Sequence, residues 1–80
     1  MTIIEPVSID STAIIENSTI GPNVSISEYA KISNSTITDS IISQKAVIED
    51  CVIEQSIIGV EAAIKGKRGS LNIARTEVKI

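Results

Sequence analysis

The chain has 80 residues, a net charge of −3 and one cysteine. This charge is too small to indicate a nucleic-acid or anionic-membrane partner, and no stretch approaches the roughly 20 apolar residues of a membrane span. Isoleucine occurs 18 times, whereas Phe and Trp are absent and Tyr occurs once. A core filled by one β-branched aliphatic side chain predicts extended backbone and a narrow interior of constant width.

A short internal repeat runs through the chain. Eleven times a small or β-branched residue is followed two positions later by isoleucine, and the isoleucines recur every five or six residues. In chain order the pairs are Val7-Ile9, Thr12-Ile14, Ser18-Ile20, Val24-Ile26, Ala30-Ile32, Ser35-Ile37, Ser40-Ile42, Ala46-Ile48, Cys51-Ile53, Ser56-Ile58 and Ala62-Ile64. Residues two apart in a strand point to the same side. Each pair therefore predicts a short strand facing a common interior.

The corners between these strands lack the Asn-Gly or Asp-Gly signature of hairpins. Each strand is therefore expected to pair in parallel with the strand one circuit away. Three strands per circuit predict three isoleucine columns, which are Ile3, Ile20, Ile37 and Ile53; Ile9, Ile26, Ile42 and Ile58; and Ile14, Ile32, Ile48 and Ile64. The corner residues also align, as Asn17, Asn34 and Asp50 on one edge and Asn23, Asp39 and Gln55 on the next. Asn and Asp tolerate the left-handed backbone conformation of a sharp corner.

The repeat predicts one all-β domain over residues 1–80, a single-stranded parallel β-helix of about four triangular coils. The coils are expected over residues 3–64. Residues 65–80 are expected to form a terminal turn and a short C-terminal cap, in which Leu71, Ile73 and Val78 fold over the last coil.

The chain resembles the hexapeptide-repeat left-handed β-helix. More narrowly, it is similar to the C-terminal domain of glucose-1-phosphate thymidylyltransferase-like sugar nucleotidyltransferases. The segments that carry this resemblance are residues 5–9, 18–26, 34–42, 56–59 and 69–73, together with the alternation of five- and six-residue spacings. The resemblance implies a left-handed coil. It also implies chemistry in an N-terminal nucleotide-binding domain, and the 80 residues contain neither a Gly-rich phosphate loop nor the metal-binding carboxylates of such a domain.

We expect no catalytic residue, no cofactor and no metal site in this chain. It contains no histidine, which removes the usual general base at neutral pH and the usual zinc ligand. The carboxylates considered for a site, at Glu49, Asp50, Glu54 and Glu61, are interpreted as solvated corner and outward positions. Residues 65–69, Lys-Gly-Lys-Arg-Gly, are interpreted as the turn that ends the coil. Cys51 is interpreted as a packing residue, which fits a reducing compartment and a cytoplasmic location.

The outward positions of the repeat become apolar toward the C-terminus, which predicts a surface for another protein. Ile41 and Ile57 are expected to stack on one face, with Val47 and Val52 on the neighbouring faces. Ile3 and Ile4 start the first strand without a cap, so we expect another chain to cover that end. The expected partner is a second or third copy, giving a dimer or trimer, or a separate catalytic domain. No nucleic acid and no membrane is expected as a partner.

The sequence therefore predicts a non-catalytic oligomerisation or interaction module. Two alternatives remain. The chain is a fragment or subunit of a glucose-1-phosphate nucleotidyltransferase whose transferase activity lies in an N-terminal domain, or it is a β-helix that binds a ligand without histidine.

Overall fold

The computed structural model describes residues 2–70 and the backbone of residues 72–75. Its fourteen short strands form three parallel sheets, with no helix in the described part of the chain. Sheet A contains β1 (Thr2–Ile3), β4 (Thr19–Ile20), β7 (Thr36–Thr38), β10 (Val52–Glu54) and β13 (Arg68–Gly69). Sheet B contains β2 (Val7–Ile9), β5 (Val24–Ile26), β8 (Ser40–Ile42), β11 (Ile57–Val60) and β14 (Asn72–Arg75). Sheet C contains β3 (Ile14–Glu16), β6 (Lys31–Ser33), β9 (Val47–Glu49) and β12 (Ala63–Lys65).

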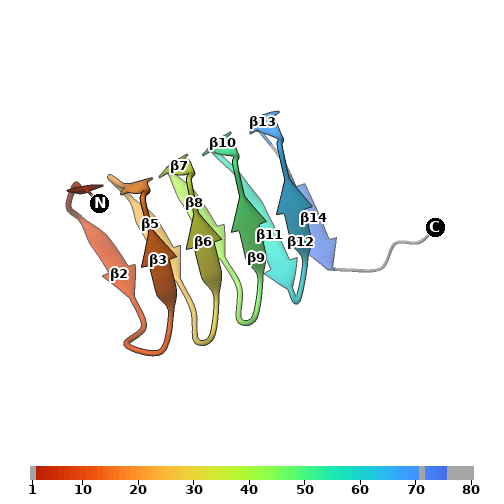
Figure 1. Ribbon diagram of the computed structural model, residues 1–80, viewed down its shortest axis with the longest axis horizontal. Coiled ribbons are helices and arrows are strands. Elements are labelled where there is room, and N and C mark those ends of the chain that lie inside the picture. The colour runs from red at the N-terminus through yellow and green to blue at the C-terminus, as the bar shows by residue number, and fades with distance from the viewer. Residues whose placement is uncertain (1, 71, 76–80) are drawn as a thin grey trace.

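Consecutive strands belong to different sheets, so the chain winds as a three-sided β-helix of about 4 turns. In Figure 1 the sheet C strands run upward at the front and the sheet B strands run downward behind them, while the coil advances from left to right. This sense of winding is left-handed. The fold class predicted from the repeat is confirmed.

The inward isoleucines form columns along all three sheets. Ile3, Ile20, Ile37 and Ile53 are in register in sheet A, and Ile9, Ile26, Ile42 and Ile58 in sheet B, as predicted. From the second coil onward these side chains are between 0% and 3% exposed. Since each fully buried isoleucine stabilises the fold by about 2 kcal/mol, the columns are the main source of stability.

The first coil of sheet C corrects one prediction. Ile15, not Ile14, pairs with Ile32, and Ile14 pairs with Lys31 on the outer face, where it is 50% exposed. Ala13, which the spacing places outward, packs with Ile15 against the core. The repeat pair is therefore Ala13-Ile15. Three consecutive apolar residues allow either alternation, and the turn that begins at Asp10 decides which one forms. The Asp10 carbonyl accepts the Ala13 N–H over 3.0 Å, so Ala13 takes the small inward position.

Buried serines connect successive coils. The hydroxyls of Ser18, Ser35, Ser40 and Ser56 each donate to the carbonyl oxygen two residues earlier, at 2.7 to 2.8 Å. Three of these oxygens also accept a backbone N–H one coil further on: Ser18 from Ser35, Ser35 from Cys51, and Ser40 from Ser56, each over 3.1 Å. The small inward position therefore has a polar function, since at Ser18, Ser35 and Ser40 the hydroxyl oxygen satisfies a backbone N–H of the next coil.

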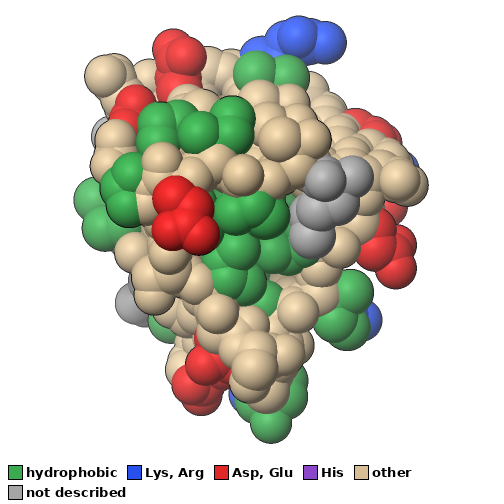
Figure 2. Space-filling model, turned by 90° about the vertical axis from the view of Figure 1, so that its left-hand side faces the viewer, with side chains coloured by type: hydrophobic (Ala, Val, Ile, Leu, Met, Phe, Trp, Pro, Cys, Tyr) green, Lys and Arg blue, Asp and Glu red, His purple; other side chains and the backbone are tan. Residues whose placement is uncertain are grey.

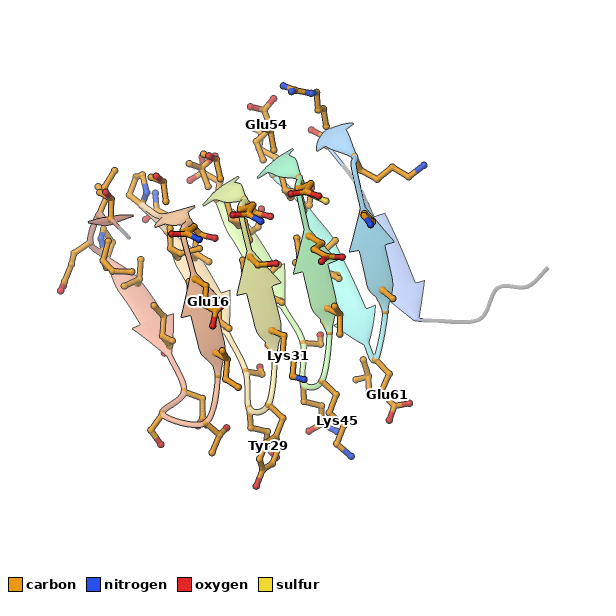
Figure 3. The ribbon with its side chains drawn as sticks, in the orientation of Figure 1. Glu16, Tyr29, Lys31, Lys45, Glu54 and Glu61 are labelled. Atoms are coloured by element: carbon orange, nitrogen blue, oxygen red, sulfur yellow. The ribbon has the colours of Figure 1, made fainter. Side chains whose placement is uncertain are left out.

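Both predicted corner rows have left-handed backbone. Asn17, Asn34 and Asp50 have φ between 49° and 53°, and Asn23, Asp39 and Gln55 have φ between 48° and 63°. A third row, not predicted, consists of Tyr29, Lys45 and Glu61, with φ between 59° and 61°. These three side chains project away from the coil at the corner between sheets B and C (Figure 3).

Strand pairing continues beyond residue 64, inside the segment assigned to the terminal turn and cap. Lys65 ends β12, Gly66 has φ +69° at the corner, and β13 then pairs with β10. The next strand, β14, pairs with β11, with Ile73 in register with Ile58. Residues 65–69 are therefore one more corner and strand. Of the predicted cap residues, Leu71 and Val78 lie outside the described residues.

Candidate interaction surface

The outer face of sheet B carries two adjacent isoleucines. Its outward row contains, in register, Ser8, Ser25, Ile41 and Ile57. Ile41 is 50% exposed and Ile57 is 52% exposed. Their side chains point outward because the inward positions of β8 and β11 are taken by Ser40, Ile42 and Ile58. The predicted stacking of Ile41 and Ile57 on one face is confirmed, and the row is polar in the two coils before this pair.

A groove of about 480 Å³ borders this pair of isoleucines along the corner between sheets A and B. Asn23, Asp39 and Gln55 form its polar side, and the Asn23 Nδ2 donates to the Asp39 Oδ1 over 3.0 Å. The groove therefore combines apolar side chains with amide and carboxylate groups at an exposed corner. Such a combination suits a polypeptide surface, which offers both apolar side chains and backbone donors.

The other predicted interface residues lie on other faces. Val47, 39% exposed, lies in the outward row of sheet C between Lys31 and Ala63. Val52, 40% exposed, lies in the outward row of sheet A between Thr36 and Arg68. The structure therefore does not bring Val47 and Val52 together with Ile41 and Ile57, and one flat partner on sheet B does not reach all four.

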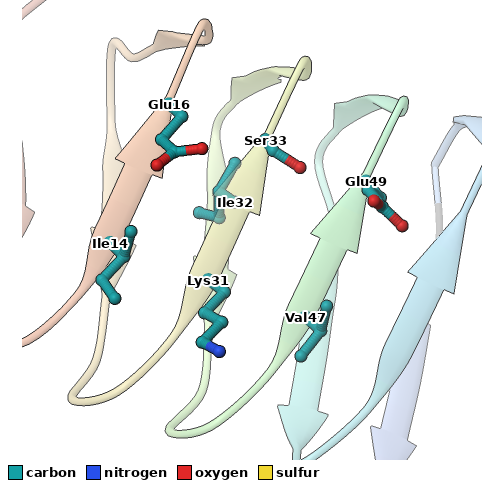
Figure 4. Close-up of a pocket in the computed structure, with 7 residues that line it drawn as sticks. All are labelled: Ile14, Glu16, Lys31, Ile32, Ser33, Val47 and Glu49. Carbon is teal, nitrogen blue, oxygen red and sulfur yellow. The ribbon is translucent and has the colours of Figure 1, made fainter.

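A second groove, of about 360 Å³, crosses sheet C and is lined by Ile14, Glu16, Lys31, Ile32, Ser33, Val47 and Glu49 (Figure 4). Glu16 and Glu49 lie toward one end of the strands, while Lys31 lies between Ile14 and Val47 toward the other. The spacing of the repeat does not predict this groove, because it places the Ile14 side chain in the interior. The only signal for it in the sequence is the run of three apolar residues at 13–15, which permits both alternations.

The N-terminal end of the coil also exposes apolar side chains. Ile3 is 39% exposed and Ile4 is 44% exposed, whereas Ile20, one coil further on, is fully buried. Figure 2 faces this end and shows hydrophobic side chains at its centre. Ile3 extends the isoleucine column of sheet A to this end, because no strand covers the first coil within residues 2–70 and 72–75. Exposed hydrophobic side chains that the repeat did not predict are Ile14, Tyr29 and Val60.

The four carboxylates considered for a catalytic or metal site do not lie together. Glu49 lies in sheet C and Glu54 in sheet A, and Asp50 and Glu61 occupy different corners. Within residues 2–70 and 72–75 there is no group of three or more His, Cys, Asp or Glu that could hold a metal ion. Cys51 is 1% exposed, and its Sγ donates to the Glu49 carbonyl oxygen over 3.1 Å, in the position that serine occupies in the preceding coils. Among the described residues no helix is long and apolar enough to cross a membrane.

Hydrogen bonds hold one carboxylate at the first corner of sheets B and C. The Asp10 Oδ2 accepts bonds from the Thr12 backbone N–H and from the Thr12 hydroxyl. These bonds, the hydroxyl bond foremost, lower the pKa of Asp10 below its ordinary value of 3.8. The Thr12 oxygen in turn accepts the Tyr29 N–H from the next coil over 2.9 Å, so Asp10 supports a turn and does not form a reactive centre.

The fold and these surfaces define a left-handed β-helix solenoid with exposed apolar side chains on all three sheets and at its N-terminal end. Comparisons of the chain with protein-family models, with curated proteins and with solved structures found no match. The coil itself therefore rests on the structure, and the similarity to nucleotidyltransferase tails remains an expectation from the repeat.

Proposed function

We propose that this β-helix is a non-catalytic oligomerisation module and that sheet B binds a second copy of the chain. The observation that carries the proposal is the adjacent pair Ile41 and Ile57, each about half exposed on a flat parallel sheet. Apolar side chains concentrated on one face of a small protein commonly mark an interface. Two copies that meet through the same row bury both isoleucine pairs against each other, with the Asn23 and Asp39 corner at the rim.

The test is the mass of the particle by size-exclusion chromatography with light scattering, in about 1 M salt to screen charge-driven contacts. The test variant, Ile41→Ser with Ile57→Ser, extends the serines of the first two coils along the same row. We expect the wild type to be a dimer at micromolar concentration and this variant to be a monomer. The matched control is Ile14→Ser with Val47→Ser, two exposed residues of sheet C, and it is expected to keep the wild-type mass. A monomeric wild type, or a folded test variant with the wild-type mass, contradicts the proposal.

A second candidate function is supported by the resemblance of the repeat. In this reading the chain is a fragment or subunit of a glucose-1-phosphate nucleotidyltransferase, and the coil packs against a catalytic domain. The open apolar end at Ile3 and Ile4 supports a contact of this kind. Co-purification of the chain with a protein that has nucleotidyltransferase activity favours this candidate. A thermal shift with a sugar nucleotide favours instead a ligand-binding β-helix.

A cytoplasmic location is part of the first proposal. It is supported by the single cysteine, Cys51, which is buried and unpaired, as in proteins of reducing compartments.

A further inference from the structure

The N-terminal end of the coil presents unpaired strand edges in addition to its apolar side chains. β1, β2 and β3 are the last strands of their sheets on that side, in the described part of the chain. One coil further on, the Ile20 carbonyl accepts the Ile4 N–H over 2.8 Å and the Ile26 carbonyl accepts the Asp10 N–H over 3.0 Å. Ile3 and Ile9 are in register with these two residues, so their carbonyls face the open end in the position to accept the next strand.

The C-terminal end presents the complementary edge. The Thr36 N–H donates to the Cys51 carbonyl and the Val52 N–H donates to the Lys67 carbonyl, each over 2.9 Å. Arg68 is in register with Val52 on β13, the outermost strand of sheet A in the described part of the chain, so its N–H repeats this position at that edge. Both ends of one copy therefore offer backbone groups with which a continuing parallel coil pairs.

Charge is segregated between the same two ends. Residues 2–30 contain Glu5, Asp10, Glu16 and Glu28 and no Lys or Arg, and all four side chains are exposed. Residues 62–70 contain Lys65, Lys67 and Arg68 and no Asp or Glu, and all three of these side chains are exposed. Two N-terminal ends brought together repel each other, whereas an N-terminal end and a C-terminal end attract each other.

We infer that the N-terminal end of the coil binds the C-terminal end of a second copy, so that β1 and β2 of one copy extend sheets A and B of the other beyond β13 and β14. This contact is heterologous and does not close, because each added copy presents a new free end. It deepens the proposed self-association, but it uses a surface separate from the row of Ile41 and Ile57, so the two contacts are tested independently.

The experiment uses the Ile41→Ser, Ile57→Ser background, which removes the proposed sheet B contact, in about 10 mM salt, where charges act over ~30 Å. The N-blocked variant adds Ile4→Lys and Glu5→Lys, and the C-blocked variant adds Lys67→Glu and Arg68→Glu, all at exposed positions. Circular dichroism and urea midpoints check that each variant folds. If Ile4→Lys prevents folding, Glu5→Lys with Glu16→Lys replaces it, since both carboxylates are exposed.

We expect the background protein to gain mass without a plateau as its concentration rises, and to return to a monomer in about 1 M salt. Each blocked variant alone is expected to stay monomeric, because only one of its ends is competent. An equimolar mixture of the two is expected to form heterodimers, because it contains one competent N-terminal end and one competent C-terminal end. Dimers of the C-blocked variant alone indicate an N-to-N contact and overturn the inference. A monomeric background, or a mixture without heterodimer, overturns it as well.

Discussion

Ser35 and Cys51 lie in neighbouring coils and are joined by a hydrogen bond of 3.1 Å, in which the Cys51 N–H donates to the Ser35 Oγ. The same hydroxyl donates to the Ser33 carbonyl over 2.8 Å. Ser35 is 4% exposed, so the buried Cys51 N–H depends on this oxygen, whereas the Ser33 carbonyl also accepts the Asp50 N–H over 3.1 Å. The hydroxyl thereby links one coil to the next at a corner where the strand ladders do not reach.

Replacing Ser35 by Ala is expected to destabilise the fold by about 1–3 kcal/mol, because it leaves the buried Cys51 N–H without its acceptor. Urea denaturation measures this change. Ser25→Ala is the control, since Ser25 is exposed in the middle of β5 and its loss is expected to change stability by less than about 0.5 kcal/mol. Equal midpoints for the two variants contradict the structural role of the Ser35 hydroxyl.

Gly21 cannot carry a side chain without moving the first coil. A Cβ at this position lies 1.9 Å from the Ile4 carbonyl oxygen, and the residue has φ +104°. Gly21→Ala is expected to destabilise the protein by more than about 2 kcal/mol, from backbone strain and overpacking together. Gly66→Ala separates the two causes, because Gly66 has φ +69° and no heavy atom within 4 Å of such a Cβ. A smaller loss, of about 1 kcal/mol, is expected there. Thermal melts of both variants test the difference.

Ile42 lies in the middle of the sheet B column and is fully buried. Ile42→Asp is expected to unfold the chain, because an unpaired carboxylate in the interior costs several kcal/mol and the isoleucine packing is lost as well. Ser25→Asp, on the outer face of the neighbouring strand, is expected to leave the fold intact. Circular dichroism at 25 °C distinguishes them, and a folded Ile42→Asp protein shows that the columns do not face the interior.

The two isoleucines at the start of sheet C test the register of the first coil. Ile14 is 50% exposed, whereas Ile15 packs against the core. Ile14→Lys is therefore expected to change stability by less than about 0.5 kcal/mol, and Ile15→Lys to destabilise by at least about 2 kcal/mol. A lower urea midpoint for Ile14→Lys than for Ile15→Lys contradicts the observed register and favours the alternation that the spacing of the repeat predicts, with Ile14 inward.

Asp10 predicts a specific dependence on pH. Hydrogen bonds from Thr12 lower its pKa in the folded state below 3.8. Its contribution to stability is therefore fully present above about pH 3.8 and is lost as the pH falls through the lowered pKa. Wild type is expected to be more stable than Asp10→Asn at about pH 6, and the difference is expected to shrink as the pH falls below 3.8. Thr12→Ala, which removes the hydroxyl donor, is expected to reduce this pH-dependent difference. Urea denaturation across this range checks it, and a difference that does not change with pH contradicts the assigned cause.

Much of the fold follows from local pattern. The spacing of the isoleucines predicts three columns. In sheets A and B every predicted member of the column is in register with the next. Asn and Asp at the corners predict two rows of left-handed backbone, because these residues adopt that conformation at low cost. The third row was not predictable from residue type, since Tyr29, Lys45 and Glu61 have no such preference. Only closure of the coil imposes positive φ on them.

The candidate surfaces were predictable where the outward residue lies between two clear inward ones, as for Ile41 and Ile57. They were not predictable where neighbouring residues are all apolar, as at 13–15, because a strand of that composition fits either alternation. The division of the exposed hydrophobic side chains among three faces also required the structure, since a repeat specifies inside and outside but not which outward positions share a face.

The repeat alone specifies a three-sided coil lined by isoleucine, because a fixed interval between branched side chains admits few other ways to bury them. The handedness, the register at Ile15, the serine hydrogen bonds between coils and the continuation of the coil into β13 and β14 are known only from the folded chain. Each of these depends on contacts between residues about one circuit apart, which local alternation does not encode.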